Sequence, residues 1–435
     1  MLRVAKLSLQ KWPGRAFDAL ISAISGIVFA LLDLLDFILC FFYRFVDGVL
    51  EENPVPCYCY HNRGKQGILD VEEEEEEEVS ETLYGRRNFF RQMDLLSLKE
   101  RSNGGGEGGG GGKLRSSRWS DCGCESCVSW QGKGEEKLHL VVREPSQARS
   151  IRQNVSPENV VFIHGFLSSS SFWTQTVFPY LSEATTLHFR MFALDLLGFG
   201  RSPKPSNCLY RVKEHREMIE TSVIEQFRLK SFHIVAHSMG CIIALALASK
   251  YPESVKSITL VAPPYFPSNE MKQCYTPLNK LAGRKVWPPL LLVSSIMSWY
   301  EHLGRTVCFL FCRNHLIWEW IIGLITRRRD LNFLVRDMTQ HTHHSAWHTM
   351  HNVICGGAKL QDKYLEVVKR AGISLRIIHG DKDQVVPVEC SHNMKSKVPF
   401  ADLQILNDAD HNTVIVGREK SFSRDLEKFW LYSGI

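Results

Sequence analysis

The sequence predicts an α/β fold: a mostly parallel sheet with helices on both faces and an inserted helical lid domain. The first observation is that short apolar runs alternate with longer runs of helical period from residue 138 to residue 435. The second is that these apolar runs are continuous, which is typical of parallel strands buried on both faces. The expected strands are Leu138–Arg143, Val160–His164, Met191–Asp195, Phe232–Val235, Ser257–Val261, Leu375–His379 and Leu403–Leu406.

The composition is that of an ordinary globular protein, with 435 residues, of which 44% are hydrophobic and 23% charged. These proportions exclude a fully disordered, collagen-like or multi-span membrane protein. The net charge of +5 is small and the chain has no long Lys/Arg-rich stretch, so no nucleic-acid partner is expected. The 13 cysteines are too sparse for a secreted disulfide scaffold and do not settle the redox compartment.

Residues 1–60 are interpreted as a signal or membrane-anchor segment. Basic residues between positions 3 and 15 precede the uncharged run Ala19–Leu32, as in a signal peptide or signal anchor. Asp33 and Asp36 interrupt the apolar stretch, which is short of the roughly 20 residues of a spanning helix unless both lie near an interface. Because they share one helical face, an amphipathic surface helix is the alternative. We expect an anchor or uncleaved signal that lies outside the globular domain.

Residues 61–118 are interpreted as a flexible linker. The acidic run Glu72–Glu78 and the almost pure glycine run Gly104–Gly112 cannot build a hydrophobic core. Just before the linker, Cys57 and Cys59 can carry a lipid, although a cysteine near an apolar segment is a weak signal for lipidation.

The lead-in, residues 119–137, contains a cysteine cluster. Cys122, Cys124 and Cys127 form a C-x-C-x-x-C pattern. A structural zinc site needs a fourth ligand, and no paired C-x-x-C follows at the spacing of a zinc knuckle. We therefore expect disulfides or structural thiols here, and no metal.

A serine lies in the sharp turn after the expected strand Phe232–Val235. Ser238 is followed by the apolar helical run Cys241–Ser249. A turn between strand and helix lifts such a serine above the sheet as a nucleophile, and the small residues around it let strand and helix approach closely. The G-x-S-x-G pattern departs at its first position, where Ala236 stands in place of glycine. The alternative is a purely structural serine in a tight turn.

The turn after the expected strand Val160–His164 is a candidate oxyanion loop. His164 and Gly165 lie in it, and a turn containing glycine can direct a backbone N–H toward a developing negative charge. The predicted oxyanion hole consists of the N–H of Phe166 and the N–H of Met239, the residue after the nucleophile.

The predicted acid and base follow the last two strands. Asp383 lies in the loop after Gly380, and His411 follows the last expected strand. Ser238, Asp383 and His411 therefore occur in the order nucleophile, acid, base. A serine hydroxyl needs a histidine to take its proton, and a carboxylate must hold that imidazole in the right tautomer. Asp381 is the alternative acid, but Asp383 is better placed at the tip of the loop.

The long insertion between two strands, about residues 265–372, is predicted to be a lid domain. The most apolar run of this insertion is followed by Arg327–Arg329. An apolar lid bordered by cations suits an acyl chain together with an anionic head group or membrane surface. The alternative is that its aromatic residues form only the core of the lid. Its tryptophans are Trp287, Trp299, Trp318, Trp320 and Trp347.

Five histidines of the lid lie within eleven residues. We expect lid packing or the lining of a substrate pocket from them rather than metal binding, because no carboxylate or cysteine lies among them. They are His341, His343, His344, His348 and His351.

Residues 138–435 resemble the α/β-hydrolase superfamily, whose D-x-x-G-x-G-x-S turn is matched by Asp195–Ser202. More narrowly, the chain resembles the plant BODYGUARD family in three segments, Arg118–Cys127, Arg211–His215 and His233–Gly240. This resemblance implies a lysophospholipase or carboxylic-ester hydrolase at the plasma membrane or in the outer wall of epidermal cells. It also implies a role in cuticle formation through cutin and related polyesters.

Together these observations predict a serine esterase without a cofactor that acts on lipid or hydroxy-fatty-acid esters through acylation of Ser238. The same site can transfer the acyl group to an alcohol, as an acyltransferase or polyester synthase does. A ligand receptor that retains the fold is the third possibility. The expected location is the plasma membrane, the cell wall or both.

Overall fold

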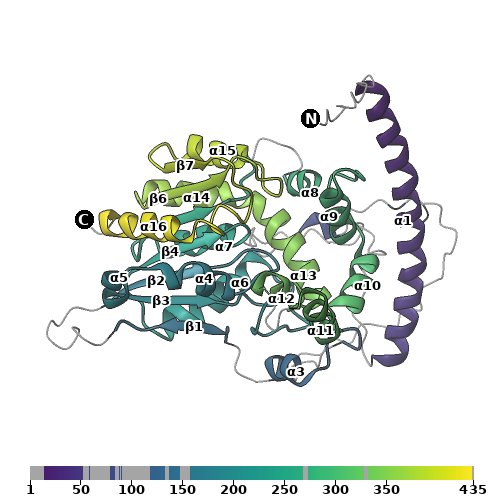
Figure 1. The fold of residues 1–435 in the computed structure, drawn as a ribbon, viewed down its shortest axis with the longest axis horizontal. Helices are drawn as coiled ribbons and strands as arrows, with labels where there is room; N and C mark the ends of the chain where they lie inside the picture. Colours follow the sequence, from purple (N-terminus) through teal and green to yellow (C-terminus); the bar gives the residue numbers. More distant parts are fainter. Residues whose placement is uncertain are drawn as a thin grey trace, which may run out of the picture.

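The computed structural model describes residues 14–51, 118–132, 137–146, 157–267, 273–327 and 332–433, together with 58, 79–83, 88 and 90. Its centre is a seven-stranded sheet in the order β1-β3-β2-β4-β5-β6-β7 (Figure 1). β1 pairs antiparallel with β3 and the other neighbouring strands are parallel, which confirms the predicted sheet. The strands are β1 (Leu140–Arg143), β2 (Glu158–Ile163), β3 (Phe189–Leu194), β4 (Phe232–His237), β5 (Val255–Val261), β6 (Ser374–Gly380) and β7 (Asp402–Leu406).

The five inner strands, β2 to β6, are mostly apolar because both of their faces are buried. Successive side chains of a strand point to opposite faces. In β2, Val161 and Ile163 belong to one hydrophobic cluster, whereas Val160 and Phe162 belong to the other. Every residue of β4 is buried. The sheet thus separates two cores, and each needs its own layer of helices.

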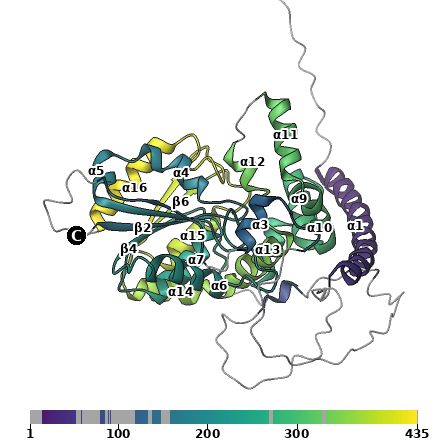
Figure 2. The same cartoon turned by 90° about the horizontal axis from the view of Figure 1, so that it is seen from below.

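Helices form those two layers (Figure 2). One face is covered by α6 (Val212–Ile219), α7 (Gly240–Lys250) and α14 (Gln361–Arg370), whose apolar residues join the first cluster. α4 (Ser171–Thr176) and α16 (Glu419–Ser433) cover the other face. The remaining helices beside the sheet are α5 (Glu183–His188) and α15 (Glu389–Lys397).

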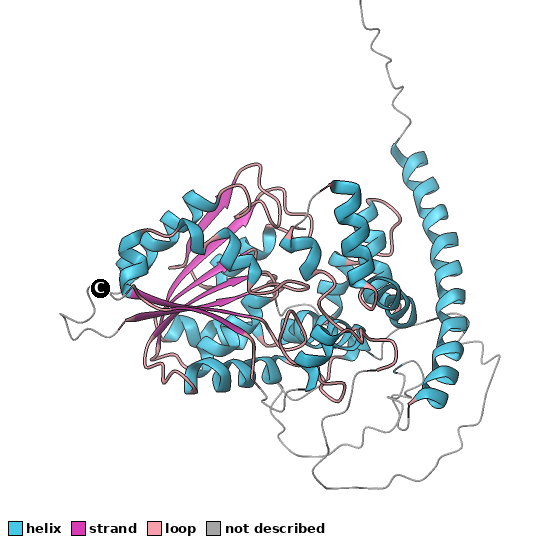
Figure 3. Ribbon diagram, turned by 60° about the horizontal axis from the view of Figure 1, so that its bottom comes forward, coloured by secondary structure: helices cyan, strands magenta, loops and turns pink. Residues whose placement is uncertain are grey.

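Between β5 and β6 the chain forms a helical lid, as expected from the long insertion (Figure 3). Its helices are α8 (Tyr275–Leu281), α9 (Pro289–Trp299), α10 (Glu301–Phe311), α11 (His315–Thr326), α12 (Phe333–Asp337) and α13 (His343–Thr349), followed by a π-helical turn (Met350–Cys355). The C-terminal boundary differs from the prediction, because α14 packs on α7 as part of the layer beside the sheet.

The N-terminal helix α1 (Gly14–Leu50) packs along the lid, so the expectation that this segment lies outside the globular domain is wrong (Figure 1). The two aspartates that interrupt its apolar stretch, Asp33 and Asp36, face the protein and not an interface. Asp36 is fully buried and accepts hydrogen bonds from the backbone N–H groups of His302 (3.1 Å) and Leu303 (3.3 Å), in the first turn of α10. Asp33 forms an ion pair with Arg284 at 3.5 Å. The carboxylates that interrupt the apolar stretch are therefore docking contacts.

Within the described residues, the part of α1 from Phe17 to Leu50 is long and apolar enough to cross a bilayer. α10 and α11, which meet at an angle of 63°, meet the same criterion only when they are taken together.

Parts of the predicted linker also pack on the protein. The backbone N–H of Ser80 donates to the side chain of Asn352 in the lid at 2.9 Å, and the Asn88 side chain donates to the Asp33 carbonyl at 2.9 Å. A flexible linker is therefore the wrong description of these residues. The acidic and glycine runs, like Cys57 and Cys59, lie outside the described residues.

Candidate active site

Ser238 lies in the turn between β4 and α7, at the carboxyl end of the sheet. Its φ of +52° is rare for a residue with a side chain, and the turn is held by a 2.8 Å hydrogen bond from the Ser238 N–H to the Val261 carbonyl. Two residues later the turn requires glycine, since a Cβ at Gly240 would lie 2.5 Å from the His164 carbonyl oxygen. The predicted strand, turn and helix are all present.

The three residues predicted as nucleophile, acid and base lie together. His411 Nε2 is 2.9 Å from Ser238 Oγ, and His411 Nδ1 is 2.7 Å from Asp383 Oδ2. Because a carboxylate can only accept, Nδ1 carries the proton and Nε2 is left to accept from the serine hydroxyl. The arrangement can take the proton of Ser238 and stabilise the imidazolium that forms.

Asp383 accepts hydrogen bonds from three donors, and a second histidine lies beside it. Its Oδ1 accepts from the backbone N–H groups of Val385 and Val386, both at 2.8 Å, and its Oδ2 lies 3.3 Å from His379 Nε2 as well as beside His411. Burial by itself would raise the pKa of Asp383. The contacts with the two histidines and the charge of His411 outweigh this effect and hold the pKa well below its usual range.

Asp381 does not join this arrangement. It is exposed, whereas the Asp383 side chain is fully buried. Of the two carboxylates that the sequence offers, the structure brings Asp383 to His411.

His237 is a residue of the site that the sequence analysis did not assign. It lies 3.0 Å from the His411 carbonyl through Nε2, which must donate, and its ring stacks on Phe172 with centroids 4.9 Å apart. Burial, with the charge of His411 as a second cause, lowers the pKa of His237 to about 3. The ring therefore stays neutral and keeps its N–H directed at the backbone of His411. The sequence signal that could have identified His237 as a residue of the site is its position directly before Ser238.

The predicted oxyanion loop lies against the serine turn. A Cβ at Gly165 would lie 3.1 Å from the Cβ of Ser238, a tight contact, so glycine favours the close approach of the two turns. His164 fixes the loop, because its Nδ1 lies 2.7 Å from the Gly165 carbonyl and its Nε2 accepts from the Leu196 N–H at 2.9 Å. Within the described part of the chain, the N–H groups of Phe166 and Met239 donate to no acceptor. Both are thus available for an oxyanion.

The lid contacts the elements around the site. Phe333 of α12 packs near Phe172, and the hydroxyl of Ser169 donates to Asp337 at 2.8 Å. The lid tryptophans divide between two roles: Trp347 is buried, whereas Trp287 is 62% and Trp320 67% exposed. Trp347 therefore belongs to the core of the lid, whereas Trp287 and Trp320 lie on its apolar outer surface.

The five lid histidines are buried, and each has its own environment. His344 lies 2.9 Å from the Cys208 carbonyl and His351 lies 2.8 Å from Thr82 of the former linker segment. His341 lies beside two cysteine sulfurs, with its Nε2 3.6 Å from Sγ of both Cys308 and Cys312 of α10.

The C-x-C-x-x-C cluster has a fourth partner in the structure. His315, at the start of α11, directs Nε2 at the cysteines of the lead-in. The fourth donor, which the sequence does not place near the cysteines, is thus a histidine of the lid. All cysteines among the described residues are free thiols, so of the two expected states, disulfides or structural thiols, the structure shows thiols.

The comparisons with known proteins agree with this architecture. A family described as alpha/beta hydrolase fold matches residues 158–418, so the chain belongs to the α/β-hydrolase family. The chain is 48% identical over 423 residues to probable lysophospholipase BODYGUARD 4 of Arabidopsis thaliana, covering 96% of this chain and 99% of that protein. It is 47% identical over 426 residues to probable lysophospholipase BODYGUARD 5 of the same plant, covering 94% and 95%. The chain is a member of the BODYGUARD family.

Proposed function

We propose that this protein is a serine hydrolase of carboxylic esters that acts on lipid substrates. The observation that carries the proposal is the hydrogen-bonded chain from Ser238 through His411 to Asp383. The relatives named probable lysophospholipases support a lipid ester as the substrate. Metal or cofactor chemistry is not part of this mechanism.

The reaction follows from the geometry of the site. His411 Nε2 takes the proton of Ser238 Oγ, and Oγ attacks the ester carbonyl. The N–H groups of Phe166 and Met239 stabilise the oxyanion of the tetrahedral intermediate. His411 then gives the proton to the leaving alcohol, and an acyl-enzyme remains. Water, activated by the same histidine, releases the acid and restores Ser238.

Long acyl chains are the proposed specificity. The lid is helical and apolar, and each CH₂ group that an acyl chain buries contributes roughly 0.8 kcal/mol to binding. kcat/KM should therefore rise from two-carbon to sixteen-carbon esters. Lysophospholipids and cutin-type hydroxy-fatty esters are both long-chain esters, and we propose a role in cuticle formation on the family resemblance.

We further propose that the protein works on a membrane surface, at the plasma membrane or the adjoining cell wall. The outward face of α1 between Asp18 and Arg44 bears no exposed charge, because Asp33 and Asp36 face inward. These 25 residues make an apolar band about 37 Å long on the outward face of the helix. Its exposed apolar side chains include Leu20, Ile24, Ile27, Leu31, Leu34, Leu35, Ile38 and Phe42.

The lid also exposes apolar side chains. α11 exposes Leu316, Ile317, Trp320, Leu324 and Ile325. A water-soluble helix places polar residues outward, and here polar residues face inward while apolar ones face outward. Lipid contact explains this inverted pattern. Arg328 and Arg329, proposed to meet anionic head groups, lie outside the described residues.

A fluorophosphonate probe and a panel of lysophospholipids and hydroxy-fatty esters test the proposal. The purified full chain should be labelled at Ser238 and should hydrolyse the panel, and Ser238→Ala should abolish both. Ser396→Ala, on the exposed surface, is the matched control and should retain both. Unchanged activity of Ser238→Ala would overturn the proposal. Acyl transfer to an added alcohol in place of hydrolysis would indicate a polyester synthase, and ligand binding without turnover would indicate a receptor.

A further inference from the structure

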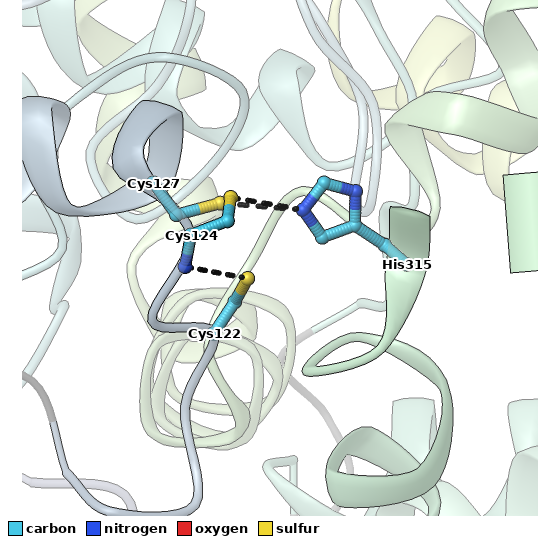
Figure 4. Close-up of side chains that lie close together, drawn as sticks. All are labelled: Cys122, Cys124, Cys127 and His315. Atoms are coloured by element: carbon cyan, nitrogen blue, oxygen red, sulfur yellow. Dashed lines mark hydrogen bonds between the residues drawn. The ribbon is translucent and has the colours of Figure 1, made fainter. Parts of the chain in front are cut away.

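The cysteine cluster of the lead-in and a histidine of the lid form a four-donor site (Figure 4). Cys122 and Cys124 lie just before α3 (Glu125–Gly132) and Cys127 lies within it, while His315 begins α11. One donor atom from each of the four residues lies within 4.8 Å of the others. Figure 4 shows the sulfurs and the imidazole nitrogen converging on one point from two separate segments.

The distances match those of a tetrahedral zinc site. Zinc binds thiolate sulfur at about 2.3 Å and imidazole nitrogen at about 2.0–2.1 Å, so a tetrahedral ion separates sulfur from nitrogen by about 3.6 Å. His315 Nε2 lies 3.5 Å from Cys124 Sγ and 3.6 Å from Cys127 Sγ. A single imidazole nitrogen cannot form two good hydrogen bonds to thiols. A shared ion accounts for both distances.

The second nitrogen of His315 provides an independent observation. Its Nδ1 lies 3.0 Å from Glu319 Oε1, one turn further along α11. A histidine that binds a metal usually donates its other ring N–H to a carboxylate or carbonyl, which fixes the tautomer and the orientation of the ring. Glu319 thus leaves Nε2 unprotonated and directed at the three sulfurs. The histidine itself is buried.

We propose that Cys122, Cys124, Cys127 and His315 bind one structural Zn²⁺ ion. Three thiols give up their protons to solvent when the ion binds, and the imidazole remains neutral. Four protein ligands leave no open coordination position, so the site stabilises the fold and does not activate water. The ion joins the lead-in to the lid at the N-terminus of α11.

The position of the site in the fold shows what the bound ion would stabilise. Within four residues before Cys122, the lead-in places Trp119 and Ser120 against Arg305 of α10. Trp119 also donates to Asp47 of α1 at 2.6 Å. The lead-in therefore contacts both α1 and the lid where Asp47 meets Arg305. A metal ion at its end would hold this segment in place.

The test measures zinc in the full chain purified without chelators. Cys308, Cys312 and His341 form another group of three donors, so the measured quantity is the difference between variants. The double variant Cys124→Ser/Cys127→Ser should contain one zinc ion per chain less than the wild type. Cys208→Ser removes a thiol outside both groups and should leave the zinc content unchanged. Equal zinc contents in the double variant and the wild type would overturn the proposal.

Differential alkylation of the wild type covers the case in which the double variant does not fold. The three cysteines should resist alkylation in the purified protein and should react after zinc is removed with a chelator. A disulfide between two of them in freshly purified protein would overturn the proposal. Glu319→Gln should keep the site but weaken zinc affinity by about 10–100-fold, measured by competition with a chromogenic chelator. Unchanged affinity in Glu319→Gln would contradict the orienting role of the carboxylate.

Discussion

Asp47 of α1 accepts two hydrogen bonds from the guanidinium group of Arg305 in the lid, at 2.6 and 2.7 Å, and both side chains are buried. The guanidinium carbon of Arg305 lies over the ring of Tyr43, 4.4 Å from its centroid. Hydrogen bonds to Ser120 complete the environment of the guanidinium group. An ion pair with this geometry joins the N-terminal helix to the lid as one folded unit.

Replacing Asp47 by Ala should destabilise that unit strongly. The substitution leaves the Arg305 charge buried without its partner, and removing one member of a buried pair costs about 3–5 kcal/mol. We expect a clearly lower midpoint of thermal unfolding for the lid. Asp18→Ala on the same helix is the control, because Asp18 is exposed. Recovery in the double variant Asp47→Leu/Arg305→Met would show that the uncompensated charge causes the loss. An Asp47→Ala protein as stable as the wild type would contradict the prediction.

The outward face of α1 should carry the membrane affinity. Burying an aliphatic side chain contributes about 1.5–3 kcal/mol, so each charged substitution on this face should weaken partitioning at least about ten-fold. The variant Leu31→Glu/Ile38→Glu should therefore remain with the soluble fraction in flotation with phosphatidylcholine–phosphatidylserine vesicles. Both side chains are more than half exposed, at 61% and 54%. Phe400→Glu, at a 50% exposed position beside β7, should float like the wild type. If the double variant floated with the vesicles, the outward face of α1 would not be the surface that binds the membrane.

The sheet and the candidate site could be predicted because their signals are local. A buried parallel strand is a mostly apolar run, and Ser238 and Asp383 each follow such a strand at the carboxyl edge of the sheet, while His411 follows the edge strand β7. Gly240 adds a local requirement, since a side chain there would collide with the loop after β2. The segments that resemble the α/β-hydrolase and BODYGUARD families indicate the same fold and the same site.

Contacts between distant segments were not predictable in this way. The fourth donor of the cysteine cluster is 188 residues beyond Cys127, and no periodicity connects the two positions. In the sequence, Asp36 interrupts an apolar helix. Its partners are backbone N–H groups some 266 residues away, so the sequence does not show why a carboxylate is present there. The sequence shows that such a residue is polar, but it does not show which distant group binds to it.

Stability should depend on pH through Asp337. Burial raises the pKa of this carboxyl to about 6, although the hydrogen bond from Ser169 acts in the opposite direction. The folded protein thus binds this proton more tightly than the unfolded chain, whose Asp has a pKa of about 3.9. The favourable contribution is complete below about pH 4 and is lost as pH rises through about 6.

Asp337→Asn keeps an acceptor for Ser169 and removes the titration. Relative to the wild type, the variant should gain on the order of 2 kcal/mol in free energy of unfolding between pH 4 and pH 8. Denaturant unfolding at several pH values measures this difference. Asp381→Asn, at an exposed carboxyl, is the control and should show no such gain. A difference between Asp337→Asn and the wild type that does not change with pH would contradict the prediction.

The last prediction separates the two carboxylates of the loop after β6. Asp383→Asn should lower kcat by about 10⁴ with the protein still folded, because an amide no longer holds His411 in the tautomer that accepts the serine proton. Asp381→Asn should reduce kcat at least about ten-fold less, since Asp381 is exposed and does not reach the histidine. Steady-state kinetics on a long-chain ester gives both values, and fluorophosphonate labelling should slow in the same order. If Asp381→Asn were the more damaging variant, the acid would be Asp381, and the contact between Asp383 and His411 would serve only to support the loop.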